Sequence, residues 1–172
     1  SGPLTGDAAQ YGVGVKNAIQ LAVNEVNAAG GVNGNKLKLV FEDDEADSGD
    51  KAVNAYNTLK DQGMQIFLGT VTTGSCLAVV DKSKQDNIFQ FTPSASAQDV
   101  IANDNCFQIC FTDPNQGKAS ADCIADNKVA TKIGVIYDSS DAYSSGIYNA
   151  FKTEAAAKGL ELVSEQSFTR DS

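Results

Sequence analysis

The sequence contains no histidine and no tryptophan, with only one methionine and three prolines among its 172 residues. Histidine is the commonest general base and a frequent metal ligand, so its absence excludes Ser-His and Cys-His catalytic pairs and most zinc sites. Long apolar runs are also lacking, since residues 76–80 (CLAVV) are typical of the longest. A bilayer-spanning helix needs about 20 apolar residues, so we expect no membrane insertion of this chain.

Basic residues are scarce. Thirteen lysines and arginines face 22 acidic residues, which gives a net charge of −9. A chain of this charge is repelled by nucleic acid and by anionic membrane surfaces, so neither is an expected partner. The hydrophobic content of 42% and charged content of 20% are ordinary for a soluble globular protein of one or two domains.

Four cysteines are present: Cys76, Cys106, Cys110 and Cys123. Cys106 and Cys110 fall on one predicted strand, about 13 Å apart, which is too far for a disulfide between them. Either could pair with Cys123, and the even count permits disulfides without requiring them. The spacing has no tight C-x2-C pair, so it does not predict a zinc site.

Hydrophobic periodicity and turn residues predict alternating helices and strands. Helices are expected over 9–29, 50–62, 73–86, 114–127 and 143–158, with a short one at 98–102, and strands over 36–42, 64–68, 88–92, 106–111, 132–138 and 160–168. Such alternation predicts an α/β fold with Rossmann-like, mostly parallel sheets. The expected domains are 1–113 and 114–172, with the boundary near Asp113 and Pro114.

Two helices have predicted buried stripes. In the helix over 9–29 the apolar stripe comprises Val15, Ala18, Ile19, Ala22, Val23 and Val26. In the next helix, which Ser48 or Asp50 can cap, it comprises Ala52, Val53, Tyr56 and Leu59. The first helix follows a glycine-containing loop of the kind that normally follows a strand, so we expect that a strand preceding Ser1 belongs to the fold.

Hydroxyl residues gather in the loops that follow the predicted strands, where open α/β sheets bind their ligands. Thr72, Thr73 and Ser75 stand at the start of the helix over 73–86. A helix N-terminus offers N–H groups and a positive dipole end, so these residues could hold a carboxylate. The alternative is that Thr73 only caps its own helix, and the two interpretations are compatible.

The loop over 92–96 (TPSAS) repeats this arrangement after the next strand, with Ser94 and Ser96 as the candidates and an ordinary capped turn as the alternative. Two aromatic residues, Tyr11 and Tyr143, lie in other loops of the same kind. Their rings could cover an apolar side chain or face an ammonium group. The alternative for both rings is surface packing.

Two further motifs have simpler explanations. The acidic cluster over 41–47 could hold Mg²⁺ as in a phosphate-receiver domain, but a solvated loop leading to a helix N-terminus is the favoured interpretation. The Gly-Val-Gly at 12–14 lacks the third glycine of a dinucleotide fingerprint, because residue 17 is asparagine. No catalytic constellation is found, so we expect a protein that is not an enzyme and uses no cofactor or metal.

The ordered motifs of the chain resemble those of a known family. Residues 1–47, GTVTTGSCLAV at 69–79, FTPSASA at 91–97, CFQICFTDPNQG at 106–117 and KIGVIYDSSDAYSSGIYNAF at 132–151 follow in the order and spacing of the extracellular amino-acid-binding proteins of ABC transporters. These are the leucine/isoleucine/valine-binding type, with the type I periplasmic binding protein fold. The resemblance covers essentially the whole chain.

The resemblance implies two α/β lobes joined by a hinge that close on a ligand. The residues matching Thr73 and Ser96 bind the ligand carboxylate, backbone groups near Ser94 and Ala95 assist, and Thr72 flanks the site. The residues matching Tyr11 and Tyr143 line the side-chain pocket and its far wall. Family members are longer, so we expect lobe one without its first strand plus the start of lobe two, needing the remainder of the protein to complete the fold.

Three functions remain open from the sequence. The leading one is a solute-binding protein that delivers a small amino acid, branched-chain or similar, to a membrane permease, located outside the cell, in the periplasm or on the surface as a lipoprotein. The second is a sensory domain of the same fold in a receptor or regulator. The third is a phosphate receiver built around Asp43 and Asp44. The chain by itself is expected to bind an amino acid weakly or not at all.

Overall fold

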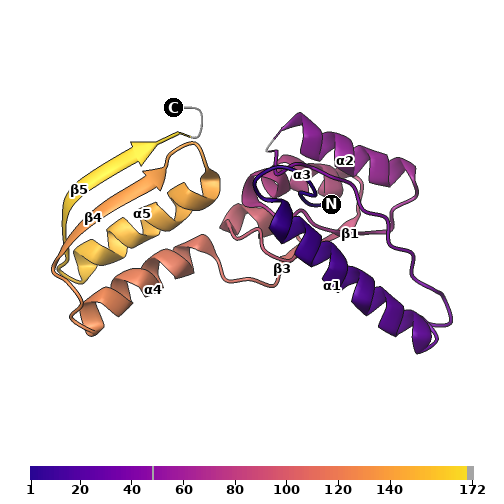
Figure 1. Cartoon of the computed structure of the whole chain (residues 1–172), viewed down its shortest axis with the longest axis horizontal. Coiled ribbons are helices and arrows are strands. Elements are labelled where there is room, and N and C mark those ends of the chain that lie inside the picture. Colours follow the sequence, from indigo (N-terminus) through magenta and orange to yellow (C-terminus); the bar gives the residue numbers. More distant parts are fainter. Residues whose placement is uncertain (48, 170–172) are drawn as a thin grey trace. The chain divides into compact units, whose positions relative to one another are not determined.

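A computed structural model describes residues 1–47 and 49–169 of the chain (Figure 1). The chain forms two compact units. The first comprises Ser1–Ala95 with Val100–Ile109, and the second comprises Ser96–Asp99 with the chain from Cys110 onward. The expected domains 1–113 and 114–172 stay a prediction. No helix of the described residues combines the length and apolar character needed to cross a membrane.

The first unit is built on a parallel sheet of three strands. They are β1 (Ile66–Leu68), β2 (Phe89–Thr92) and β3 (Cys106–Gln108), in the order β1-β2-β3. Three α-helices accompany them: α1 (Ala9–Ala28), α2 (Asp50–Asp61) and α3 (Thr73–Gln85). A 3-10 helix, η1 (Gln98–Ile101), follows β2. Because Leu68 pairs with Phe91 and Phe91 with Phe107, all three strands end at one edge of the sheet.

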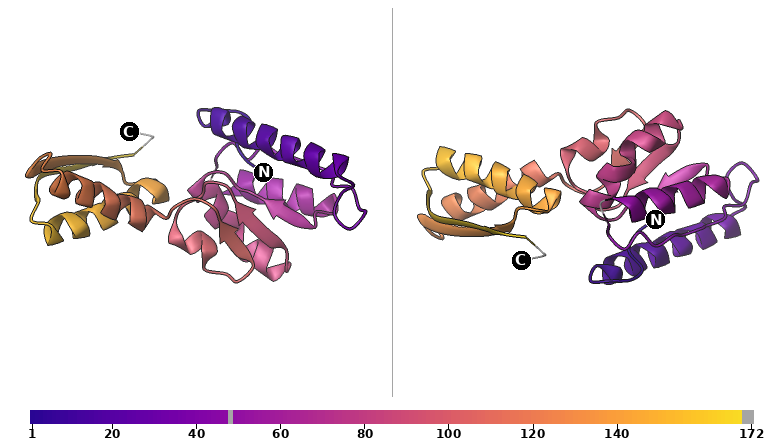
Figure 2. Two further views of the ribbon diagram at one scale, coloured as in Figure 1. Left: turned by 90° about the horizontal axis from the view of Figure 1, so that it is seen from below. Right: turned by 90° about the horizontal axis from the view of Figure 1, so that it is seen from above.

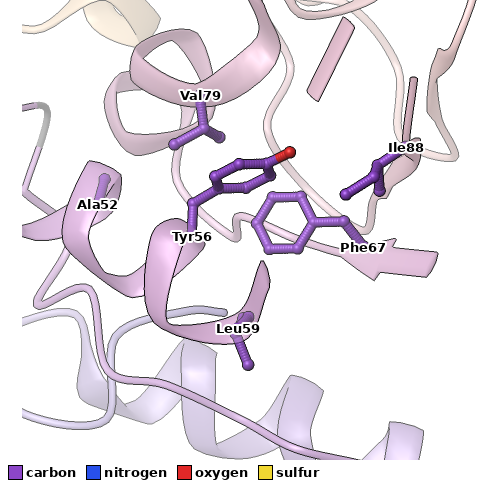
Figure 3. Packing of buried hydrophobic residues seen from close by; sticks show 6 residues of the cluster. All are labelled: Ala52, Tyr56, Leu59, Phe67, Val79 and Ile88. Carbon is purple, nitrogen blue, oxygen red and sulfur yellow. The ribbon is translucent and has the colours of Figure 1, made fainter. Parts of the chain in front are cut away.

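Tyr56 of α2 and Phe67 of β1 form the centre of the core in this unit (Figure 3). Their rings pack edge to face with centroids 5.2 Å apart, an arrangement that aromatic quadrupoles favour. The other buried members are Ala52, Leu59, Val79 and Ile88. The Tyr56 hydroxyl donates to the Asp86 carboxylate at 2.9 Å, so the buried ring keeps its polar end paired. The predicted stripe of α2 is thereby confirmed for Ala52, Tyr56 and Leu59.

The second unit packs two helices on one face of a two-stranded parallel sheet (Figure 2). Its elements are α4 (Asp113–Asp126), β4 (Lys132–Asp138), α5 (Ala142–Ala157) and β5 (Glu161–Phe168). Ala121, Phe151, Ala155 and Leu160 form its core. A Cβ on Gly117 of α4 would lie 2.4 Å from the carbonyl oxygen of Ile147, so only glycine permits the close approach of α4 and α5.

The prediction of a strand over residues 36–42 is wrong. Residues 36–42 form no strand, and the pairing next to them is one parallel bridge between Gly2 and Asp43. A strand requires a partner along its length, and residues 1–2 supply a single rung. The predicted burial of the α1 stripe is also too strong, since Ala18 and Ala22 are exposed and the other four members are half-buried.

The capping of α2 and the acidic cluster also differ from expectation. The Asp47 carboxylate, and not that of Asp50, accepts from the backbone N–H groups of Gly49 and Lys51 at 3.2 and 2.9 Å. Ser48, the other predicted cap, lies outside the described residues. Asp44 is fully buried, and Asp43 accepts from the Leu4 N–H at 2.8 Å. The cluster therefore leads to the N-terminus of α2, as the favoured interpretation expects, with Glu45 exposed, but Asp43 and Asp44 also hold residues 1–5 and are not merely solvated.

Cys110 lies outside the strand that was predicted to contain both Cys106 and Cys110, because β3 ends at Gln108. Cys76 and Cys106 are buried thiols, whereas Cys123 is exposed. Burial raises the pKa of the Cys76 thiol to about 12, which keeps this sulfur protonated and unreactive at neutral pH.

Candidate functional site

Two hydroxyl-rich loops lie side by side at the carboxyl ends of β1 and β2. The Gly69 N–H donates to the Phe91 carbonyl at 2.9 Å. The Thr92 hydroxyl donates to the Thr70 carbonyl at 2.7 Å, and the Ser94 hydroxyl donates to the Val71 carbonyl at 2.5 Å. The predicted pair of neighbouring loops is therefore present, and side-chain hydrogen bonds to the backbone hold the two loops together.

The start of α3 lies in the first of these loops. Thr72 is the N-cap residue, but its side chain makes no capping hydrogen bond, and its hydroxyl oxygen lies 2.9 Å from that of Ser75. Thr73 is the first helical residue and is only 4% exposed. The Thr72 side chain therefore does not cap α3, and a helix N-terminus with its N–H groups and positive dipole end is suited to an anion.

The second loop ends with Ala95. This residue is fully buried, and its N–H donates to the Thr92 hydroxyl oxygen at 3.0 Å. Thr92 therefore both donates to the first loop and accepts from its own loop. The sequence pattern indicated Ser94 and Ser96 but not Thr92, because a residue at the end of a predicted strand is interpreted as part of the sheet. The structure brings Thr72, Thr73, Ser94 and Ala95 together around this framework.

Ser96 belongs to the second unit and has an unexpected partner there. Its hydroxyl donates to Asp113 Oδ1 at 2.6 Å, and the Asp113 N–H donates to the Ser96 carbonyl at 2.9 Å. A hydroxyl has one proton, so while Ser96 donates to Asp113 it can only accept a hydrogen bond from a ligand. This differs from the carboxylate-donating role that the resemblance implies for Ser96.

Asp113 was treated in the sequence only as a boundary residue, yet it is 1% exposed. Burial raises the pKa of its carboxyl group, the Ser96 hydrogen bond lowers that pKa in part, and the negative charge of Asp141 raises it. The second carboxylate oxygen, Oδ2, is buried without a hydrogen-bond partner among the described residues. The only sequence signal was its place beside Thr112, which caps α4 by accepting from the Asn115 N–H.

The two aromatic candidates are placed differently. Tyr11 lies in the first turn of α1 and is 61% exposed, outside the hydrogen-bonded group of the two loops. Tyr143 lies in the first turn of α5 in the second unit, where its hydroxyl oxygen is 3.5 Å from Gln116 Nε2. It is 40% exposed, so much of the ring remains accessible to another molecule.

Among residues 1–47 and 49–169, no group of three or more Cys, Asp or Glu side chains is arranged to hold a metal ion. The loops of the first unit instead present hydroxyl groups, backbone N–H groups and a helix N-terminus. These are uncharged donors of the type that bind carboxylates.

Comparison with known proteins places this arrangement in a family. The family model described as "periplasmic binding protein" matches residues 1–171. The chain belongs to the periplasmic binding protein family. The predicted family and the predicted α/β fold of its type I members are therefore confirmed.

Individual relatives agree with this assignment. The chain is 35% identical over 169 residues to Leu/Ile/Val-binding protein homolog 3 of Brucella melitensis. This match covers 97% of the chain and 45% of the relative. It is 32% identical to the Leu/Ile/Val-binding protein BraC3 of Rhizobium johnstonii, covering 97% of the chain and 46% of the relative. The chain thus spans about half the length of the curated relatives it matches.

A solved structure shows the same arrangement of elements. The substrate-binding protein LivJ of a branched-chain amino acid transporter from Streptococcus pneumoniae, in complex with isoleucine, superposes with a TM-score of 0.90 at 25% identity. The match covers 99% of the chain and 49% of LivJ.

Proposed function

We propose that this chain contributes the amino-acid-binding portion of an ABC transporter solute-binding protein. The protein captures a small amino acid, branched-chain or similar, and delivers it to the membrane permease. One structural observation supports the proposal: the two hydrogen-bonded hydroxyl loops lie at the carboxyl ends of β1 and β2, next to the N-terminus of α3, where the Thr72 side chain makes no capping hydrogen bond. The family and the names of the relatives agree with it.

The α-carboxylate of the amino acid is the group we assign to this end of α3. The N–H groups of the first turn point along the helix axis, and the helix dipole favours a negative charge there. Thr73 stands at this turn, and its hydroxyl is proposed to donate to the carboxylate, with Thr72 flanking it. Ser94 donates its proton to Val71, so its hydroxyl oxygen serves as an acceptor.

The remaining predicted ligand residues enter the proposal through the family. Backbone groups at Ser94 and Ala95 assist in binding. For Ser96 the proposal departs from the family role: because its hydroxyl donates to Asp113, it accepts from the ligand ammonium instead of donating to the carboxylate. Tyr11 and Tyr143 contact the ligand side chain or its ammonium. Binding of this kind uses neutral donors and acceptors, and it requires no nucleophile, cofactor or metal. We accordingly propose a non-catalytic protein.

The proposed location is outside the cytoplasm. Family members are periplasmic or extracellular substrate-binding proteins. Attachment to the cell surface as a lipoprotein belongs to the proposal as well, since it would hold the protein near its permease.

A thermal-shift screen of the chain against the standard amino acids, each at tens of millimolar, tests the function. Ligand binding to the folded state raises the unfolding midpoint by mass action. Of the two expectations for the chain by itself, weak binding or none, the proposal requires weak binding, so we expect a small rise with one or a few aliphatic amino acids, and its loss in Thr73→Ala. Thr153→Ala is the matched control, because Thr153 is an exposed residue of α5. A panel without any shift, or an equal shift in Thr73→Ala, would contradict the proposal.

A further inference from the structure

Gln90 is a buried amide beneath the first of the two hydroxyl-rich loops. It lies on β2, the central strand of the three-stranded sheet, and is only 1% exposed. Glutamine side chains are mostly exposed in folded proteins, and a buried amide costs free energy unless its hydrogen bonds are made. An apolar residue of similar volume would fill this place without that cost, so the role of Gln90 lies in the contacts of its amide.

The Nε2 group of Gln90 holds two points of the neighbouring segment. It donates to the Gly69 carbonyl at 3.1 Å and to the Cys76 sulfur at 3.3 Å. The oxygen of the amide is paired as well, because the Cys106 thiol donates to Oε1 at 3.7 Å. Since the Gly69 carbonyl can only accept a hydrogen bond, these contacts fix the amide in one orientation.

The two points lie on either side of the proposed carboxylate-binding residues. Gly69 follows directly after β1, and Cys76 is the fourth residue of α3, which begins at Thr73. The Cys76 N–H donates to the Thr72 carbonyl at 3.0 Å, which is the hydrogen bond that closes the first turn of α3. A shift of Gly69 or Cys76 would therefore move the start of the helix.

Gln90 is also the first member of a regular series of donors. Backbone pairing of β1 with β2 ends where the Gly69 N–H donates to the Phe91 carbonyl. Beyond this point the carbonyls of residues 69, 70 and 71 accept from the side chains of residues 90, 92 and 94, in that order. Gln90 and Thr92 can act together because residues two positions apart on a strand point to the same face. Side-chain donors thus hold three successive peptide groups just before α3.

We propose, on the basis of the proposed function, that Gln90 is a positioning residue of the carboxylate site. Its amide holds Gly69 and Cys76 so that the first turn of α3 keeps one orientation toward the ligand. Because Gln90 is buried, it acts on the ligand only through the segment that it holds. Hydrogen bonds are directional, so displaced donors weaken carboxylate binding more than they weaken apolar contacts.

Gln90→Met in the 172-residue chain tests this role. Methionine fills the space but has no donor, so it leaves the Gly69 carbonyl without this partner. Tyr56→Phe is the matched control, because it removes the hydrogen bond of another buried residue of the first unit, to Asp86 at the opposite end of α3. Leucine and leucinamide are the probes, since the second compound lacks the carboxylate.

The binding measurement follows amide signals at the start of α3. We expect the leucine-dependent shifts of Gly74 and Ser75 to fall at least about threefold in Gln90→Met at equal leucine concentration, and to be unchanged in Tyr56→Phe. A purely structural role would lower the unfolding midpoint of both variants and leave the difference between leucine and leucinamide as it is in the unsubstituted chain. That outcome would overturn the proposal.

Hydrogen exchange without ligand gives a second readout that does not depend on the proposed function. The amides of Gly69 and Cys76 should lose protection at least about tenfold in Gln90→Met relative to Tyr56→Phe. If leucine does not shift the unsubstituted chain, the proposed function is contradicted, and the exchange rates still decide the role of Gln90. Equal protection in the two variants would overturn that role. If Gln90→Met does not fold, Gln90→Asn is measured instead with the same expected outcomes, because its amide is one methylene too short to hold both points.

Discussion

Individual hydroxyl and carboxyl groups in this chain have partners that decide their possible roles. Thr92 and Ser94 donate to the neighbouring loop, so they position the site more than they bind a ligand. Thr73 is the first residue of α3, at a helix end suited to an anion, which makes it the main candidate for donating to a carboxylate in the proposed function. Ser96 is committed to Asp113, a pairing that residue types and spacing cannot predict, because the two residues are 17 positions apart.

The buried α-amine of Ser1 predicts a pH dependence of stability. Its pKa falls from 8.0 to about 5 on folding, so between these values the unfolded chain binds a proton that the folded chain does not. The free energy of unfolding should therefore be largest above pH 8 and fall as the pH drops toward 5, by up to about 1.4 kcal/mol per unit. Urea titrations of the 172-residue chain across this range measure the slope.

N-terminal acetylation provides the control for that experiment. An acetylated amine cannot titrate, so the acetylated chain should lose this part of the slope between pH 5 and 8. Carboxyl groups remote from Ser1 are present in both forms and cancel in the comparison, whereas Asp44, whose pKa burial raises and the Ser1 amine lowers, belongs to the same interacting pair. Identical slopes for the acetylated and free chains would show that the Ser1 amine is not responsible.

At the level of helices and strands, periodic patterns predicted most elements to within two or three residues. β4 and α5 illustrate why, since their apolar residues pack within one local α/β unit. The segment 36–42 shows the limit of such reasoning. Its alternating pattern is typical of a strand, but strand formation depends on a partner that sequence periodicity does not report.

For the candidate site, the sequence likewise predicted the general arrangement but not the individual contacts. Parallel strands end at the same edge of a sheet, so the sequence predicted that the two hydroxyl-rich loops after β1 and β2 would meet. The structure confirms this prediction. Which hydroxyl donates to which carbonyl depends on side-chain positions within a few tenths of an ångström, and patterns cannot supply them. Asp113 was missed because almost fully buried carboxylates are rare and nothing in its neighbours indicates burial.

The core of the first unit depends on contact between α2 and β1, which predicts the effect of one substitution. Phe67→Ala removes a ring that is 1% exposed and packs against Tyr56, and should lower the free energy of unfolding of this unit by about 3–5 kcal/mol. Phe111→Ala changes a residue that is 64% exposed, and should cost no more than about 0.5 kcal/mol. Chemical denaturation followed by circular dichroism compares the two variants.

An equal loss of stability in these two variants would contradict the assignment of the core. The two units have separate cores, so the transition of the first unit should shift while that of the second unit, built on Phe151 and Leu160, stays in place.

For the whole molecule, the net charge of −9 restricts how the proposed carboxylate site can work. An acidic chain repels free carboxylates at long range, so a carboxylate site must rely on short-range donors. Backbone N–H groups and hydroxyls at the end of α3 are donors of this kind. In the proposed function they bind the carboxylate that all amino acids share, and selection among amino acids falls to the contacts around the side chain.

The central claim is that the end of α3 binds an amino-acid carboxylate, and an amide NMR titration of the isotope-labelled chain tests it most directly. Leucine is compared with leucinamide, which keeps the side chain and the ammonium but lacks the carboxylate. We predict that leucine shifts the amide signals of Gly74 and Ser75, that leucinamide does not, and that Thr73→Ala weakens the response to leucine. Equal shifts with both compounds, or none with leucine, would contradict the account.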